Sequence, residues 1–195
     1  MHFQHSDDIW RTFPELVAGV LLVQGTTSDA DVEAPVTELS TQYRSAAESL
    51  LRRYRKEGSL PHLHPLVDLC NAASLAFAIP VAAFDLARIT GHLEVRRAAG
   101  HESYLTFTGE AEHPNPGEVI FADDHGHAHA RRWTNRQSGA SAVRGSTSRV
   151  LIVTEALHDT ASTDVRALHA VLATAIGAAW SPTPTSTRVT SSTRT

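Results

Sequence analysis

The chain has 195 residues, of which 42% are hydrophobic and 19% charged, a composition typical of a globular protein with one sizeable core. It has no run of about twenty apolar residues, which excludes a membrane-spanning helix. The formal net charge of −4 argues against nucleic-acid binding through overall positive charge. The first ten residues lack a basic start followed by an apolar run, so we expect a cytoplasmic protein with no membrane partner.

The first half of the chain is predicted to hold one strand and two helices. The apolar run 16–23 predicts a buried strand, and the polar stretch 25–40 predicts a loop. Apolar residues at helical spacing predict a helix over 43–56, which ends in a basic turn. A second helix is predicted over 65–78 and stops before Pro80.

The second half is predicted to consist of short strands and turns followed by a helix. Asp85 is expected to cap a short helical turn. Strands are predicted where turn residues separate short apolar stretches, at 92–98, 103–108, 118–122, 127–133 and 149–155. Residues 163–179 have apolar positions at helical spacing, whereas Ser, Thr, Pro and Arg dominate 181–195. We therefore expect one domain over 1–180 and a disordered tail over 181–195.

Three motifs single this sequence out. The stretch HPLVDLCNAASLAFAIPVAAFD at 64–85 places Asp68 and Asn71 three residues apart, on one face of the predicted helix. PGEVIFADD follows at 116–124 and RRWTNRQS at 131–138. In this order and spacing the motifs resemble the tRNA-editing domain of the phenylalanyl-tRNA synthetase beta subunit, and more closely the free-standing relatives of that domain.

The resemblance covers residues 60–157 and specifies a fold. Strands and helices without regular alternation already favour the α+β class. The resemblance implies, in addition, a layered domain that contains a β-sandwich of unusual topology with helices packed on it.

The resemblance also implies a reaction, the hydrolysis in trans of the ester that joins a wrong amino acid to its tRNA. A positioned water molecule is sufficient for this activated bond, and amide groups can orient it. The implied catalytic residues are Asn71, Asn135 and Gln137, the substrate contacts are Asp68, Ala82, Ala83, Trp133 and Arg136, and the RNA contacts are Arg131, Arg132 and Arg144. Mischarged tRNA is the expected partner, and neither DNA, a cofactor nor a metal is expected.

Two positions depart from the family pattern. Synthetase members carry a histidine before Ala-Phe-Asp, and this chain has Ala82 there. The change removes a proton-transfer group, although the small pair Ala82 and Ala83 leaves room for an amino-acid side chain. Synthetase members also use a glutamate to recognise the hydroxyl group of a tyrosine substrate. This chain has no counterpart of that glutamate, since Gln137 or Gly139 aligns with it. The sequence is equally compatible with two roles for Asp68, a substrate contact and an internal hydrogen bond to the adjoining loop.

Two other functions are compatible with the sequence. The missing histidine and the acidic net charge favour a non-catalytic module that binds tRNA or an amino-acid-like ligand. Alternatively, His125, His127 and His129 would project from one face of a strand and could hold a metal ion in a hydrolase. No fourth ligand is evident for such a site.

Overall fold

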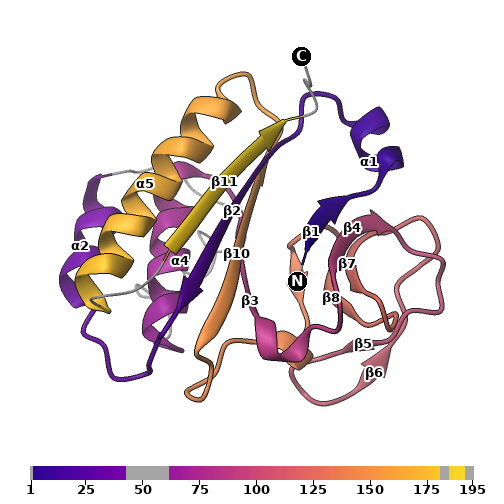
Figure 1. Ribbon diagram of the computed structural model, residues 1–195, viewed down its shortest axis with the longest axis horizontal. Helices are drawn as coiled ribbons and strands as arrows, with labels where there is room; N and C mark the ends of the chain where they lie inside the picture. The colour runs from indigo at the N-terminus through magenta and orange to yellow at the C-terminus, as the bar shows by residue number, and fades with distance from the viewer. Residues whose placement is uncertain (1, 43–61, 181–184, 192–195) are drawn as a thin grey trace. The chain divides into compact units, whose positions relative to one another are not determined.

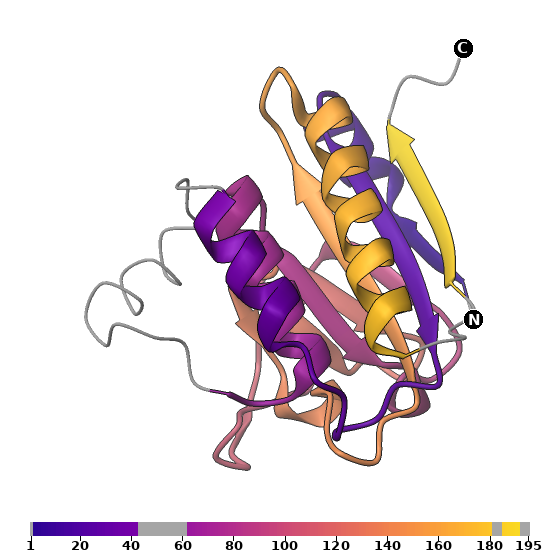
Figure 2. The same ribbon diagram turned by 90° about the vertical axis from the view of Figure 1, so that its left-hand side faces the viewer.

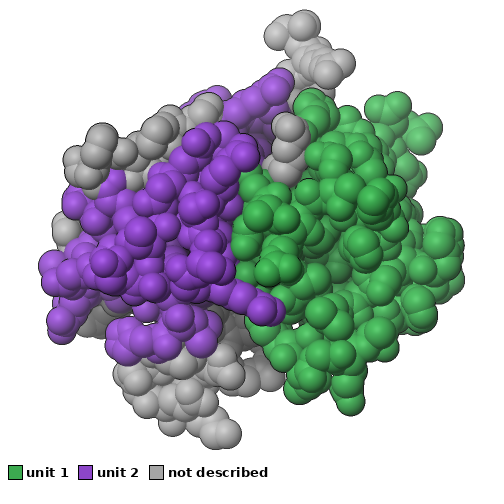
Figure 3. Space-filling view, turned by 60° about the horizontal axis from the view of Figure 1, so that its bottom comes forward, with its two compact units in different colours: residues 1–14, 84–142, 192–195 green, residues 15–83, 143–191 purple. Residues whose placement is uncertain are grey.

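The computed structural model describes residues 2–42, 62–180 and 185–191 (Figure 1). The helix predicted over 43–56 lies outside the described residues. The chain divides into two compact units, which Figure 3 distinguishes by colour. Unit 1 consists of residues 1–14, 84–142 and 192–195, and unit 2 of residues 15–83 and 143–191. No helix in the described part of the chain is long and apolar enough to cross a membrane. The predicted extent of the domain, residues 1–180, stays a prediction.

Unit 2 is built on an antiparallel ladder between β2 (Val17–Gln24) and β10 (Arg149–Ala156). Both strands are rich in buried aliphatic side chains, as expected for strands covered by other elements. They confirm the strands predicted over 16–23 and 149–155. The sheet has the order β11-β2-β10-β3, where β3 is Val81–Asp85 and β11 is Thr185–Ser191. The last two residues of β3 belong to unit 1.

Three helices lie on one side of this sheet, as Figure 2 shows. They are α2 (Glu33–Gln42), α4 (Pro65–Phe77) and α5 (Ala161–Ala179). α5 packs on the strands, and α4 contacts both α2 and α5. The core between them contains fully buried aliphatic side chains, among them Leu21, Leu69, Ile152 and Leu168. Burying each such side chain contributes roughly 2 kcal/mol, so the helical period predicted over 163–179 is explained by packing.

Helix α4 begins and ends where the sequence indicates. Pro65 occupies the first turn, where its missing N–H is not needed, and the His64 side chain accepts a hydrogen bond from the Leu66 N–H at 3.2 Å. Ala78 ends the helix in the left-handed conformation, with φ of 55°, and Pro80 follows shortly after. The helix predicted over 65–78 is therefore confirmed.

Two predicted segments were wrong in part. The stretch 25–40, predicted as a loop, contains the start of α2, because the Asp31 carboxylate accepts a hydrogen bond from the Glu33 N–H at 3.0 Å and caps the chain there. Residues 185–191, assigned to a disordered tail, form β11 and pair with β2. Backbone pairing does not require apolar side chains, which is why the composition concealed this strand.

Unit 1 contains a sheet in the order β1-β4-β7-β8-β9. Its strands are β1 (Phe3–His5), β4 (Leu93–Arg97), β7 (Val119–Asp123), β8 (Ala128–Arg131) and β9 (Arg136–Gln137). A separate ladder joins β5 (Tyr104–Leu105) to β6 (Ala111–Glu112), and the short helices are α1 (Asp7–Thr12), η1 (Leu86–Arg88) and η2 (Gly139–Ser141). The strands predicted at 92–98, 103–108 and 127–133 are confirmed with shorter bounds, and the strand predicted at 118–122 is confirmed one residue further along.

Aromatic packing and a local cap support unit 1. The Phe121 ring stacks on the Phe84 ring with centroids 5.6 Å apart, and the Phe3 ring lies 6.2 Å away from Phe121. The Asp85 carboxylate accepts a hydrogen bond from the Ala87 N–H at 2.9 Å, which confirms the predicted cap. Two units that mix strands and helices in this way confirm the predicted α+β class.

Helix α5 packs tightly against the sheet of unit 2 at a glycine. Gly19 on β2 lies opposite Thr154 on β10, and the Thr154 hydroxyl is 2.9 Å from Nε2 of the buried His169 on α5. A Cβ atom at Gly19 would lie 2.6 Å from His169 Nε2, from Thr154 Oγ1 and from the side chain of Val165. The absence of a side chain at this position therefore sets the distance between helix and sheet.

We expect Gly19→Ala to destabilise the protein by about 3 kcal/mol, because the added methyl group overpacks a site with no room to adjust. The matched control is Gly177→Ala on α5, where a Cβ meets nothing within 4 Å. That variant should gain about 0.5 kcal/mol from the lower backbone entropy of alanine. Urea unfolding of both variants measures the difference, and equal stabilities would contradict the packing described.

The stability of unit 2 should depend on the protonation of His169. Burial lowers the pKa of this histidine to about 4, so the unfolded chain binds the extra proton first when the pH falls. The free energy of unfolding should consequently decrease as the pH falls from about 6.5 to about 4, by roughly 3 kcal/mol. His169→Gln, which cannot titrate, should lack this part of the acid slope in urea unfolding. An unchanged slope would show that other groups cause the acid sensitivity.

Candidate functional site

The motif RRWTNRQS forms the hairpin between β8 and β9 in unit 1. Arg132 and Trp133 both have positive φ, 49° and 59°, at the start of the loop that joins the paired residues Arg131 and Arg136. Such angles are unfavourable for a bulky residue, so other contacts must hold Trp133 in place. Its N–H donates to the Val119 carbonyl at 3.0 Å, and its ring packs edge-on against Phe13 with centroids 5.3 Å apart. The turn leaves Arg132 and Asn135 exposed.

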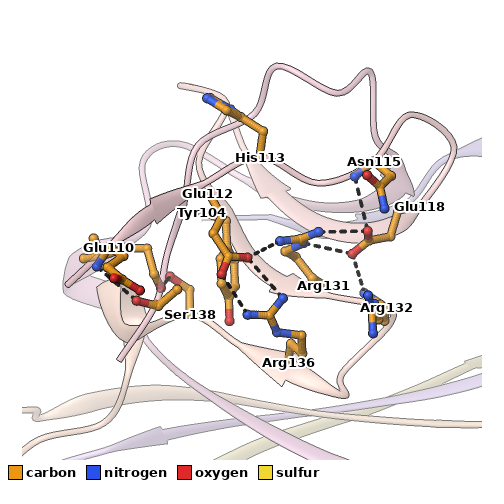
Figure 4. Close-up of polar contacts among 12 residues, drawn as sticks. Tyr104, Glu110, Glu112, His113, Asn115, Glu118, Arg131, Arg132, Arg136 and Ser138 are labelled. Atoms are coloured by element: carbon orange, nitrogen blue, oxygen red, sulfur yellow. Dashed lines mark hydrogen bonds and ion pairs between the residues drawn. The ribbon is translucent and has the colours of Figure 1, made fainter. Parts of the chain in front are cut away.

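Arg131, at the base of this hairpin, lies between two carboxylates (Figure 4). Its Nε and Nη2 atoms donate to Glu118 at 2.9 and 3.1 Å, and its Nη1 atom donates to Glu112 at 2.6 Å. The residue is only 4% exposed. We expected Arg131 to contact RNA, and the structure corrects this expectation, since its donors face carboxylates inside unit 1.

Arg136 completes the same network from β9. Its two terminal nitrogens donate to the two oxygens of Glu112 at 3.1 and 3.2 Å. The guanidinium groups of Arg131 and Arg136 lie over the Tyr104 ring, 5.2 and 5.3 Å from its centroid, and the Tyr104 hydroxyl donates to the Gln137 carbonyl at 2.8 Å. Cation–π contacts and bidentate pairing thus fix the hairpin on β5 and β6.

The network is electrically balanced. The hydrogen bond from Arg131 lowers the pKa of Glu118, and the hydrogen bond from Arg136 lowers the pKa of Glu112. Both carboxylates are consequently ionised at neutral pH, and two positive charges face two negative charges. The charges of Arg131 and Arg136 are therefore already neutralised by carboxylates and are not free to bind phosphate. Of the arginines in the described β8–β9 hairpin, the exposed Arg132 is the one whose side chain is outside these pairs.

The motif helix α4 places Asp68 and Asn71 in unit 2. Asp68 accepts a hydrogen bond from the Leu63 N–H at 3.2 Å and lies 3.3 Å from His62 Nδ1. The internal hydrogen bond to the adjoining loop, one of the two roles expected for Asp68, is therefore present. Asn71 is half-buried, whereas its neighbours Cys70 and Ala72 are buried. The Asn71 side chain is therefore partly open to solvent.

The predicted site residues fall in both units. Unit 2 holds Asp68, Asn71, Ala82, Ala83 and Arg144, and unit 1 holds Arg131, Arg132, Trp133, Asn135, Arg136 and Gln137. Within unit 1, the hairpin brings the motif residues together. Within unit 2, Ala82 and Ala83 are buried in β3, and Arg144 is exposed in the loop before β10. Catalytic and substrate roles for these residues stay predictions.

No sequence pattern identified Tyr104, Glu112 or Glu118 as partners of the motif arginines. Glu118 belongs to the motif PGEVIFADD, and its place in that motif was the one sequence signal that could have indicated its importance. Tyr104 and Glu112 are paired residues of the two-residue strands β5 and β6. Strands this short carry no readable period, so their position beside β8 could not be predicted.

The three alternating histidines, His125, His127 and His129, all interact with the Asp123 carboxylate. Asp123 accepts hydrogen bonds from the N–H groups of His125, His127 and Thr90, at 3.0, 2.9 and 3.1 Å. His129 is buried with Nε2 3.3 Å from Asp123, while the His127 side chain is half exposed. Within residues 2–42, 62–180 and 185–191, no group of three or more His, Cys, Asp or Glu side chains could hold a metal ion. The histidine segment is thus organised as a turn around Asp123.

Comparison with known proteins identifies the family. The B3/4 domain family matches residues 35–171, and the chain belongs to it. The N-terminal fragment of the phenylalanyl-tRNA synthetase beta subunit from Pyrococcus horikoshii has a similar fold, with a TM-score of 0.58 over 94% of this chain and 50% of that one, at 12% identity. The resemblance inferred from the motifs is confirmed.

Curated relatives agree with this assignment. Phenylalanine–tRNA ligase beta subunits from Cereibacter sphaeroides and Legionella pneumophila (strain Paris) are each 35% identical to this chain, over 75 and 68 residues. These regions are 38% and 35% of this chain, and 9% of each relative. The chain is therefore similar to one domain of a much longer subunit.

The carboxylate network predicts a specific loss of stability. Glu118→Gln removes the charge that neutralises Arg131, whose side chain is 5% exposed, and should destabilise the protein by about 3 kcal/mol. Glu110→Gln, at an exposed position on the β5–β6 turn, is the control and should change stability by less than about 0.5 kcal/mol. Thermal unfolding compares the two variants. Equal midpoints would mean that the Arg131 pair does not support the hairpin.

Proposed function

We propose that this chain is an aminoacyl-tRNA deacylase that acts in trans and removes a mischarged amino acid by water-mediated ester hydrolysis. Membership of the B3/4 family and the likeness to phenylalanine–tRNA ligase beta subunits support a role connected with tRNA. The matched relatives are about ten times longer than the matched region. Activity without a synthetase body is therefore part of the proposal.

The observation that carries the proposal is the placement of Asn71. Its side chain is partly open to solvent, on the helix whose motif resembles the editing domain. An amide can donate a hydrogen bond to an ester oxygen and accept one from water. Because the aminoacyl ester is already activated, orientation of these two groups supplies the main catalytic contribution.

Exposed polar groups in each unit support contact with RNA. Arg132 and Asn135 are presented to solvent by the β8–β9 turn, and Arg144 is exposed in unit 2. We propose Arg132 and Arg144 as phosphate contacts and exclude Arg131, which is buried against carboxylates. Asn135 and Gln137 remain proposed substrate-positioning residues of the hairpin, and Arg136 acts through its pairing with Glu112.

A second candidate function is a module that binds tRNA or an amino-acid-like ligand without catalysis. The favouring observation is Ala82, which replaces the histidine of synthetase members and is buried, with 2% exposure. A methyl group can neither accept nor deliver a proton. The two candidates differ in one respect that an assay can measure, the rate of ester hydrolysis.

The decisive assay is deacylation of a panel of mischarged tRNAs by the isolated chain. We expect at least one panel member to be hydrolysed faster than in buffer, and Asn71→Ala to reduce that rate about a hundredfold by removing an orienting group. Asn115→Ala, at an exposed position of unit 1, is the control and should retain full activity.

Each alternative outcome has a defined meaning. Binding of tRNA without hydrolysis of any panel member would replace the deacylase by the non-catalytic module. Hydrolysis that survives Asn71→Ala would remove Asn71 from the reaction. Circular dichroism of both variants distinguishes a lost site from a lost fold.

A further inference from the structure

Phe107 is the most exposed of the large hydrophobic residues in the described part of the chain. It lies in unit 1, in the turn between β5 and β6, and is 73% exposed. Leu105, which ends β5, is 37% exposed. A single apolar side chain on a surface is common and by itself indicates no function. The structure of the turn, its neighbours and its charge decide whether this ring has a ligand.

The turn that carries Phe107 is held by its own hydrogen bonds. The Thr106 N–H donates to the Glu110 carbonyl at 2.9 Å, and the Glu110 N–H donates to the Thr106 hydroxyl at 3.0 Å. Gly109 supplies the left-handed conformation, with φ of 89°, and the Thr108 hydroxyl lies 2.8 Å from that of Thr106. None of these contacts uses the Phe107 side chain. The ring is therefore presented by a turn that is ordered without it.

This turn packs against the end of the β8–β9 hairpin. The Ser138 hydroxyl donates to the Leu105 carbonyl at 2.8 Å. A Cβ atom at Gly139 would lie 3.3 Å from the Cα atom of Phe107, so the two backbones are in close contact. Gln137, a proposed substrate-positioning residue, directly precedes Ser138. Phe107 consequently lies beside the hairpin that the proposed function assigns to the substrate.

The size of the exposed apolar surface favours a nucleobase over a protein partner. A stable protein interface buries about 800 Å² on each partner, whereas the apolar surface here consists of one phenyl ring and part of Leu105. One aromatic ring is the size of one base. Stacking needs no hydrogen-bond donor on the protein and accepts every base, because each has a π-face.

The charge beside the ring determines which nucleotide fits. The Glu110 carboxylate accepts a hydrogen bond from the Thr108 hydroxyl at 3.3 Å, and Thr108 follows Phe107 in the chain. This negative charge repels phosphate. An internal nucleotide has a phosphate on both sides, whereas the nucleotide at the 3′ end has a free hydroxyl on one side. The unpaired 3′ end of an RNA therefore fits this turn best.

We infer that the Phe107 ring stacks on the unpaired 3′-terminal base of an RNA. This inference rests on the proposed function, since the terminal ribose of tRNA carries the aminoacyl ester. Stacking holds the terminal nucleoside beside the β8–β9 hairpin, and Phe107 takes no part in breaking the ester bond. It is a substrate-binding residue that the motifs did not indicate.

Binding of an uncharged RNA tests the stacking without any hydrolysis. The probe is an RNA hairpin with a single-stranded 3′ end of sequence ACCA, and its partner probe lacks the last base but keeps the ribose. Phe107→Ala in the full chain should weaken the intact RNA about tenfold and leave the abasic RNA unchanged, because one stacked base is lost. Fluorescence anisotropy measures both affinities.

Matched variants separate stacking from a general effect on the surface. Phe107→Trp should restore the affinity for the intact RNA, whereas Phe107→Leu, which is apolar but has no π-face, should stay close to Phe107→Ala. The control is Leu157→Ala, an exposed apolar position of unit 2, which should bind as the unaltered chain does. Unchanged binding of the intact RNA by Phe107→Ala, or an equal loss for the abasic RNA, would overturn the inference.

A 3′-phosphate on the intact probe tests the placement of the chain end. It should weaken binding about threefold at low salt, and Glu110→Gln should remove this difference, since the repulsion comes from one exposed carboxylate. Equal affinity of the two RNAs for the unaltered chain would refute the placement. If the unaltered chain bound none of the RNAs, the proposed role with tRNA would fail as well, whereas binding that is insensitive to Phe107 would refute the stacking alone.

Discussion

Unit 1 depends on the need to neutralise one buried guanidinium. Arg131 is enclosed by its own sheet, and a buried charge without a counter-ion would cost several kcal/mol. Glu112 and Glu118 meet this need from β6 and from the end of the turn before β7. The requirement brings the two-residue strands against β8, aligns Tyr104 beneath both arginines and fixes the β8–β9 hairpin. Because Arg131 holds the base of the hairpin inside unit 1, the turn with Arg132 and Asn135 is left exposed.

The motifs combine structural and solvent-facing residues. Asp68 and Arg131 complete hydrogen bonds inside their own units, whereas Asn71, Arg132 and Asn135 are left at the surface or partly exposed. Residues such as Asp68 and Arg131 stabilise the fold, which explains why motifs that contain them are found together with this fold. Those of the second kind remain available for a ligand, and the proposed function rests on them.

Much of the fold could be predicted from the sequence, because its main elements bury long periodic faces. Strand β2 and helices α4 and α5 were found in this way. Strands β1, β6 and β9 have only two or three residues, and β11 pairs through its backbone despite a polar sequence. At the site, the motifs predicted Asn71 on helix α4 and grouped Asn135, Arg136 and Gln137 in one loop, but the hairpin formed by β8 and β9 was not predicted. The motifs could not reveal that Arg131 is buried, since its partner Glu112 lies outside every motif.

The central claim is that amide groups position the attacking water and that no ionisable side chain replaces the histidine absent at Ala82. The most direct test is the single-turnover rate of hydrolysis of a mischarged tRNA, measured from about pH 6 to pH 8 beside the uncatalysed reaction. The account predicts that the pH profile of the catalysed rate shows no inflection that is missing from the uncatalysed reaction. An inflection near the ordinary histidine pKa of about 6.5 would contradict it, because a titrating base would then take part in catalysis.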